Sequence, residues 1–204
     1  VDKDKKKEFL SYYIGSRNWK KVLVFTNTKS QADELVENLN LDGLKAAAIH
    51  GDITQPARQR ALADIQSGKV QVVVATDIAA RGIDIHDLPY VINYDLPQDI
   101  EDYIHRIGRT GRAGNKGEAI SLICVEEKKL LREFERELKI TMSPEEVEGF
   151  EPTEKEKRDY RPKAFKNKDK QRMKDAKNKK RTLNAPKNSK KTTKRDANKS
   201  FVKK

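Results

Sequence analysis

An eight-residue segment, HRIGRTGR at residues 105–112, carries side chains well suited to holding an anion. Arginine stays charged and offers a planar fork of donors that matches phosphate oxygens. Glycine lets the backbone turn tightly and come close to a ligand. The segment therefore predicts a phosphate site. The open alternative is that its arginines only pair with local carboxylates such as Asp77, Asp84 or Asp95.

Short apolar runs alternate with helical patterns along the chain, and together they must position this segment. The runs predict strands at residues 22–26, 45–49, 70–75, 90–94 and 118–125. Amphipathic spacing predicts helices at residues 3–14, 29–41, 55–67, 99–106 and 126–138. Thr28 and Thr54 precede two of these helices as N-caps. The alternation predicts a three-layer α/β domain with a mainly parallel sheet.

Polar motifs follow the predicted strands where those strands end. Thr28 follows the first strand, Gly51 the second and Thr76 the third. Because a parallel α/β sheet binds its ligands at the carboxyl ends of its strands, we expect the functional site at that edge.

The positive charge of the chain lies in its C-terminal part. Residues 151–204 hold 22 Lys and Arg against 7 Asp and Glu, a balance of +15, whereas residues 1–150 hold 22 against 25, a balance of −3. The C-terminal part also has few large apolar side chains, so it cannot offset the entropy cost of ordering. We predict a folded domain over residues 1–145 and a disordered or partly helical basic extension over residues 146–204. Such an arm is typical of nucleic-acid binding, with a merely solubilising tail as the alternative.

The single cysteine, Cys124, lies in an apolar run and cannot form an internal disulfide, so we interpret it as a buried core thiol. No apolar stretch approaches the length of a membrane span, and no secretory signal is visible. We therefore expect a cytoplasmic protein with no membrane partner.

Five motifs give the chain a family resemblance. They are VLVFTNT at residues 22–28, HGD…QPAR at 50–58, ATDIAARGID at 75–84, VINYDLP at 91–97 and HRIGRTGR at 105–112. In this order they resemble the second, C-terminal RecA-like domain of DEAD-box ATP-dependent RNA helicases, which belong to helicase superfamily 2. The resemblance covers about residues 1–140.

The resemblance implies roles at an ATP site shared with another domain. Arg109 and Arg112 would act as arginine fingers on the γ-phosphate, Asp84 would bind the ribose, and His105 would couple the two domains. The sequence contains no P-loop and no acidic pair that would hold magnesium. ATP with Mg²⁺ would therefore be held mainly by a first, N-terminal RecA-like domain, which we expect upstream.

The resemblance also implies contacts with an RNA backbone, made without reading its sequence. Thr28, Gly51, Arg58 and Thr76 would contribute them, to single-stranded and duplex RNA alike. Three neighbouring residues have interpretations from their own chemistry. Asp52 caps a helix, Arg106 is an internal brace, and Arg81 supports either Asp77 or RNA.

The predicted function is the second half of an ATP-dependent RNA helicase, inactive on its own because the P-loop is missing. Two alternatives stay open. One is a non-enzymatic module that binds RNA or docks a partner. The other is half of a superfamily-2 DNA translocase, against which the histidine that opens HRIGRTGR argues, because many DNA-acting relatives begin that motif with glutamine.

Overall fold

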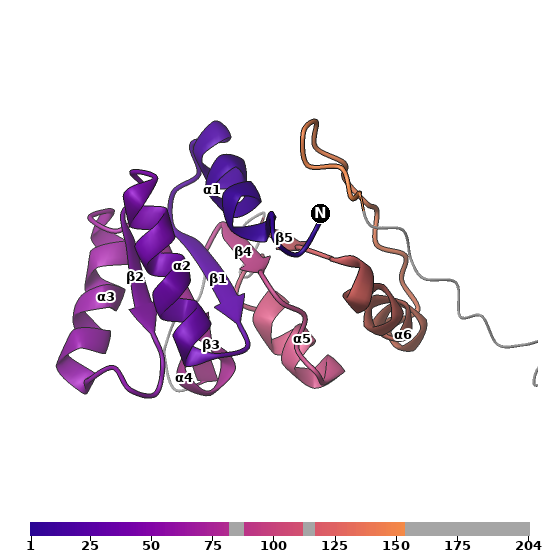
Figure 1. Ribbon diagram of the computed structural model, residues 1–204. Coiled ribbons are helices and arrows are strands. Elements are labelled where there is room, and N and C mark those ends of the chain that lie inside the picture. The colour runs from indigo at the N-terminus through magenta and orange to yellow at the C-terminus, as the bar shows by residue number, and fades with distance from the viewer. Residues whose placement is uncertain (82–87, 112–116, 154–204) are drawn as a thin grey trace, which may run out of the picture. The chain divides into compact units, whose positions relative to one another are not determined.

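The computed structural model describes residues 1–81, 88–111 and 117–153. In these ranges five strands form one sheet in which every neighbouring pair is parallel. The strands are β1 (Val22–Thr26), β2 (Ala46–Ile49), β3 (Val72–Thr76), β4 (Tyr90–Asn93) and β5 (Glu118–Ser121), in the spatial order β2-β3-β1-β4-β5 (Figure 1).

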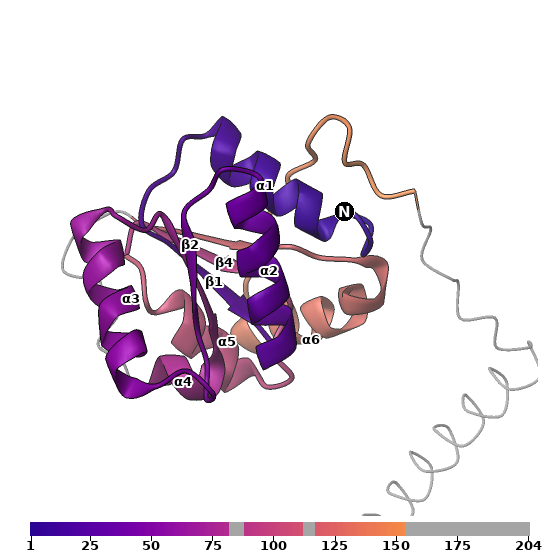
Figure 2. The same cartoon turned by 60° about the vertical axis from the view of Figure 1, so that its left-hand side comes forward.

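Helices cover both faces of this sheet and give the domain three layers. α1 (Lys6–Ser16) and α2 (Lys29–Leu41) pack on one face, and α3 (Gln55–Ser67) and α4 (Asp77–Arg81) pack on the other. Figure 2 shows α2 and α3 on opposite sides of the strands. The α/β architecture predicted from the alternation of strands and helices is therefore confirmed.

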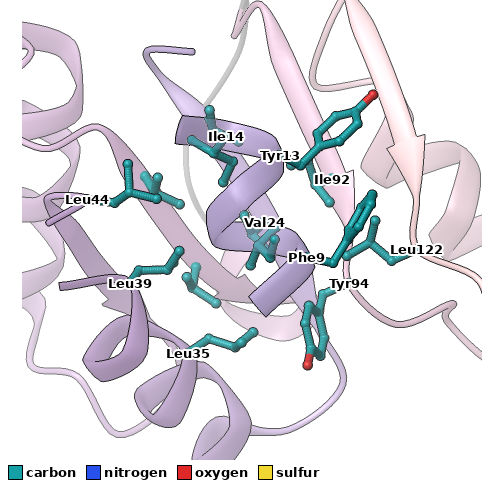
Figure 3. Packing of buried hydrophobic residues seen from close by; sticks show 14 of the residues in the cluster. Phe9, Tyr13, Ile14, Val24, Leu35, Leu39, Leu44, Ile92, Tyr94 and Leu122 are labelled. Atoms are coloured by element: carbon teal, nitrogen blue, oxygen red, sulfur yellow. The ribbon is translucent and has the colours of Figure 1, made fainter. Parts of the chain in front are cut away.

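The central strand β1 explains why two layers of helices are needed. All five of its residues are buried. Val22 and Val24 face the α1–α2 core, whereas Leu23 and Phe25 face the α3–α4 core, because successive side chains in a strand point to opposite faces. Figure 3 shows Val24 in the first of these cores.

A third, smaller cluster holds the helix that carries the start of the HRIGRTGR segment. α5 (Ile100–Ile107) packs against α6 (Lys128–Leu138) through Leu96, Tyr103 and Phe134. A 3₁₀ turn, η1 (Val125–Glu127), leads into α6. Burying a large apolar side chain contributes about 1.5–3 kcal/mol, so this cluster stabilises the position of α5.

The bounds of α2 and α3 match the prediction, and so do their caps. The Thr28 side chain accepts a hydrogen bond from the Gln31 amide at 3.2 Å, and the Thr54 side chain accepts one from the Ala57 amide at 3.4 Å. Capping depends on residues three apart, so local sequence is enough to place it.

Other bounds were wrong for identifiable reasons. The predicted strand 118–125 ends at Ser121, where the pairing with β4 ends at Asn93, and the predicted helix start at 126 lies within η1. The predicted first helix, 3–14, begins at Lys6 and ends at Ser16. The short helix α4 was not predicted.

Residues 145–153 continue to contact the domain. The Tyr13 hydroxyl donates to Glu145 at 2.9 Å, the ring of Phe150 lies 5.2 Å from that of Phe9, and the Thr153 amide donates to Asp2 at 3.0 Å. The predicted boundary after residue 145 stays a prediction. The basic extension, residues 146–204, is predicted to be disordered or partly helical. Its residues beyond 153 lie outside the described ranges, so this stays a prediction.

Cys124 is buried, as predicted. Burial, together with hydrogen bonds to neighbouring carboxylates, raises the pKa of its thiol to about 11, which makes the thiolate scarce near neutral pH. Among the helices of the described residues, none is long and apolar enough to cross a membrane.

Candidate nucleotide and nucleic-acid site

The carboxyl ends of β1, β2 and β3 bring several predicted site residues to one edge of the sheet. Thr28 lies at the N-terminus of α2 and is exposed, Gly51 lies in the turn after β2, and Thr76 ends β3. Because these strands are parallel and in register, the three positions share that edge.

A lysine that the sequence analysis did not select lies between two of these positions. Lys29 Nζ is 2.5 Å from Asp52, and both side chains are more than half exposed. A Cβ at Gly51 would come within 3.2 Å of Lys29 Cε, so glycine leaves room for the lysine to cross the turn. Asp52, interpreted from sequence as a helix cap, instead forms this ion pair.

The sequence did contain a signal for Lys29. A lysine in the first turn of a helix opposes the positive end of the helix dipole, so another role has to be sought for it. At the start of α2, directly after Thr28, the contact observed for Lys29 is its ion pair with Asp52.

Arg58 joins the same edge from the first turn of α3. Its Nη2 donates to the His50 carbonyl at 3.4 Å, which places the guanidinium beside the Gly51 turn. Its buried Nε has no hydrogen-bond partner among the residues that the structure describes. His50 itself pairs with Asp33 at 2.8 Å, so the turn is held between α2 and α3.

Thr76 is less accessible than the other predicted RNA contacts. Its side chain is only 8% exposed, at the point where β3 passes into α4. The adjacent Asp77 makes the principal contact of this edge with α5.

Arg106 is the centre of that contact and is 1% exposed. Its Nε and Nη2 donate to the two carboxylate oxygens of Asp77 at 2.6 and 2.7 Å. The guanidinium also donates to the Asp95 carbonyl at 2.6 Å and to Asn27 Oδ1 at 3.1 Å. The interpretation of Arg106 as an internal brace agrees with this geometry, and both oxygens of Asp77 are taken up by Arg106.

The predicted finger Arg109 follows this brace within one helical turn. Its amide donates to the Arg106 carbonyl at 3.1 Å. Arg109, His105 and Asp102 line a small hollow with residues of α4. His105 is exposed and Arg109 is half-buried. The hollow therefore brings together Arg109, which was assigned to the ATP site, and His105, which was assigned to the contact between domains.

Arg81 has a partner that sequence did not suggest. It forms an ion pair with Asp102 of α5, rather than with Asp77. This pair adds a second link between α4 and α5, at the surface.

The remaining predicted residues of the ATP site, Asp84 and Arg112, lie outside the described residues. Within the described ranges, no group of three or more His, Cys, Asp or Glu side chains could hold a metal ion. Among the described residues, Lys29 and Arg58 bring cations to the edge formed by the ends of β1 and β2, and Arg109 brings one to the end of α5.

A buried ion pair lies behind this edge and was also absent from the predictions. Lys6 of α1 is 2.6 Å from Glu127 of η1 and 3.9 Å from Asp95. Burial by itself would raise the pKa of the Glu127 carboxyl, but the charge and hydrogen bond of Lys6, with further hydrogen bonds, hold that pKa below its ordinary value. Burial raises the pKa of Asp95, against the opposing charge of Lys6.

Comparison with known proteins identifies the family. The model of the helicase conserved C-terminal domain matches residues 5–114. The chain is 46% identical over 142 residues to the DEAD-box ATP-dependent RNA helicase CshA of Bacillus subtilis, covering 70% of this chain and 29% of CshA. It is 50% identical over 114 residues to DEAD-box ATP-dependent RNA helicase 30 of Arabidopsis thaliana, covering 56% of this chain and 19% of that protein.

Solved structures agree with the sequence relatives. The E. coli DEAD-box protein SrmB, bound to RraA, matches with a TM-score of 0.72 and 33% identity, over 76% of this chain and 92% of that one. S. cerevisiae Dbp5, bound to RNA and ADP BeF3, matches with a TM-score of 0.62 and 34% identity, over 67% of this chain and 37% of Dbp5. The chain therefore belongs to the DEAD-box RNA helicase family and contains that family's C-terminal, RecA-like domain.

Proposed function

We propose that this chain is the second motor domain of an ATP-dependent RNA helicase and supplies Arg109 and Arg112 to ATP bound on a first RecA-like domain. One observation carries the proposal. The buried Arg106 fixes the end of α5 to Asp77, so that Arg109 is presented one turn later from a rigid support. A positive charge held in place before the reaction stabilises the negative charge that develops during phosphoryl transfer.

ATP with Mg²⁺, when bound, supplies the transferable phosphoryl group. Arg109 and Arg112 would face its γ-phosphate, Asp84 would accept a hydrogen bond from the ribose, and His105 would contact the first domain. Because these residues meet ATP only when the two domains close, hydrolysis would depend on closure.

The RNA backbone would lie along the carboxyl edge of β1 to β3. Thr28, Gly51, Arg58 and Thr76 would contact its phosphates, and Lys29, which pairs with Asp52, lies at the same edge. Contacts with phosphates carry no sequence information, so binding through them would be independent of sequence. ATP-driven closure on RNA would then couple hydrolysis to local separation of a duplex.

The basic extension, residues 146–204, would add affinity for RNA through its net charge. Every lysine or arginine that neutralises a phosphate releases counterions, so this contribution should weaken as salt rises. The preceding domain, residues 1–145, would carry the motor residues. Whether the chain instead acts as a binding module without catalysis is decided by the test that follows.

The test is RNA-stimulated ATP hydrolysis by this chain joined to a first RecA-like domain that carries a P-loop. Arg109→Ala should lower kcat by about 10³-fold or more, the range measured for arginine fingers, with RNA binding by the extension unchanged. Arg109→Lys separates charge from the planar fork and should restore only part of the activity. Arg60→Ala is the matched control, because Arg60 is an exposed arginine on α3 to which no role at ATP or RNA is assigned.

Turnover that needs both domains and Arg109 would support the helicase function. Normal turnover by Arg109→Ala would reject the finger assignment. RNA binding without any turnover by the joined protein would favour the binding module.

A further inference from the structure

Lys6 lies on the buried face of α1, where a lysine is unusual because its charged end normally stays in water. The residue is 2% exposed. Its Nζ donates to the Tyr94 carbonyl at 2.8 Å and to Glu127 Oε2 at 2.6 Å, and lies 3.9 Å from Asp95. A buried charge is tolerated only when it is paired and hydrogen-bonded, so this lysine is held by three groups from two other parts of the chain.

Two of those groups belong to the loop that follows β4, residues 94–96. The same loop is held by Glu127, whose Oε1 accepts from the Leu96 amide at 2.9 Å. Glu127 also accepts from the Cys124 amide at 3.0 Å, which anchors it to the segment before η1. Lys6 and Glu127 together fix this loop from the side of α1 and η1.

The opposite side of the loop faces the Arg106 brace. The Asp95 carbonyl accepts from Arg106 at 2.6 Å, and the Asn27 amide donates to the Asp95 carboxylate at 3.3 Å. Asn27 also donates its side-chain amide to the Leu96 carbonyl at 3.1 Å. Loop 94–96 is thus clamped between the Lys6–Glu127 pair and the guanidinium that carries α5.

We propose that Lys6 and Glu127 are positioning residues for the arginine-finger helix, acting through loop 94–96 on Arg106 and hence on Arg109. The proposal rests on the proposed function for its link to catalysis. Neither residue touches nucleotide or RNA in this role; they determine where the Asp95 carbonyl meets the guanidinium.

Charge explains why neither residue of the pair can be lost alone. Without Lys6, the partly buried carboxylate of Glu127 would lose the cation paired with it, and the carboxylate of Asp95 would keep the charge of Arg106 nearby. Removing one partner of a buried pair leaves an uncompensated charge, whereas removing both charges together costs far less. The loop should therefore move when Lys6 is neutralised and return in part when Glu127 is neutralised as well, because Asp95 and the Tyr94 carbonyl still lack Lys6.

The experiment compares three variants with the wild type. Lys6→Met keeps the length of the side chain and removes the charge. Lys6→Met with Glu127→Gln removes both charges but keeps an oxygen that can accept from the Leu96 amide. Lys7→Met is the matched control, because the neighbouring Lys7 pairs with Glu34 at the exposed surface of the same region.

The first measurement needs no catalysis. Hydrogen exchange of the Arg106 Nε–H is followed by NMR in the full chain, at a temperature where every variant is folded. We expect Lys6→Met to accelerate this exchange by about tenfold or more, the double variant to recover part of the protection, and Lys7→Met to match the wild type.

The second measurement is steady-state ATP hydrolysis by the joined two-domain protein. A displacement of about 1 Å in a reacting group can cost about 10²-fold in rate, so we expect Lys6→Met to lower kcat by about 10- to 100-fold. The KM for RNA should stay unchanged, because the RNA edge is built from other residues. Loss of fold alone would instead lower the active fraction, which near-UV circular dichroism of the same samples would report.

The outcomes separate this proposal from the proposed function. Unchanged Arg106 exchange and unchanged kcat in Lys6→Met, with Arg109→Ala inactive, would overturn the positioning role and leave the arginine finger standing. Faster Arg106 exchange with no effect of Arg109→Ala on turnover would support the clamp on Arg106 and reject the finger.

Discussion

Arg106 offers the clearest quantitative test of how this domain is built. Arg106 is 1% exposed, so Arg106→Met removes a buried charge. The substitution also leaves Asp77, Asn27 and the Asp95 carbonyl without the donor that they share. Removing one partner of a buried, hydrogen-bonded ion pair typically costs about 3–5 kcal/mol. We therefore expect the free energy of unfolding to fall by that amount.

A surface pair in the same region provides the control. The Arg81 side chain is 55% exposed and that of its partner Asp102 is 19% exposed. Because water can replace an exposed guanidinium beside Asp102, Arg81→Met should lower the free energy of unfolding by about 1 kcal/mol or less, well below the loss in Arg106→Met. Arg106→Lys should lie between these variants, because an ammonium cannot match both oxygens of Asp77 in parallel.

The assay is urea unfolding of the full chain, followed by circular dichroism and tryptophan fluorescence together. Equal slopes of free energy against urea would show that the variants unfold from comparable folded states. A loss below about 1 kcal/mol for Arg106→Met, similar to that of an exposed pair, would refute the brace.

Two further predictions concern pH and salt. The pKa of Glu127 is held below its ordinary value of 4.5, so its ionised form contributes stability above about that pH, and this contribution should be lost as pH falls through the lower folded-state pKa. Urea unfolding across that pH range should show a smaller loss of stability in Glu127→Gln than in the wild type. Equal losses in the two proteins would contradict the pair with Lys6. The raised pKa of Asp95 acts in the opposite direction, because its buried carboxylate costs stability that is regained as it is protonated; Glu127→Gln also lessens this effect, since the charge of Glu127 helps to raise the pKa of Asp95. Deleting residues 154–204 should flatten the dependence of RNA affinity on salt concentration, measured by fluorescence anisotropy, whereas an unchanged slope would show that the extension is not an RNA arm.

Sequence was most informative where structure is decided locally. The helices α2 and α3 begin after threonine caps, and the bond that makes each cap spans three residues, so both starts could be predicted. The buried runs of β1 and β3 likewise follow from continuous apolar residues, although β3 begins two residues later than predicted.

Contacts between distant residues could not be predicted in the same way. Arg106 was interpreted as a brace, but its choice of Asp77 over other carboxylates depends on how α4 and α5 meet. Lys6 did carry a signal, because it falls at helical spacing from Phe9, Leu10 and Tyr13 on the buried face of α1. Its partner Glu127 lies 121 residues away, and only the fold brings the two together.

RNA-stimulated ATP hydrolysis by the two-domain protein, with arginine or alanine at position 109, is the most direct test of the proposed helicase half. We predict turnover in the wild type that requires both domains, and a loss of about 10³-fold or more in Arg109→Ala with RNA still bound. Equal turnover by the two proteins would contradict the arginine-finger role on which the proposed function depends.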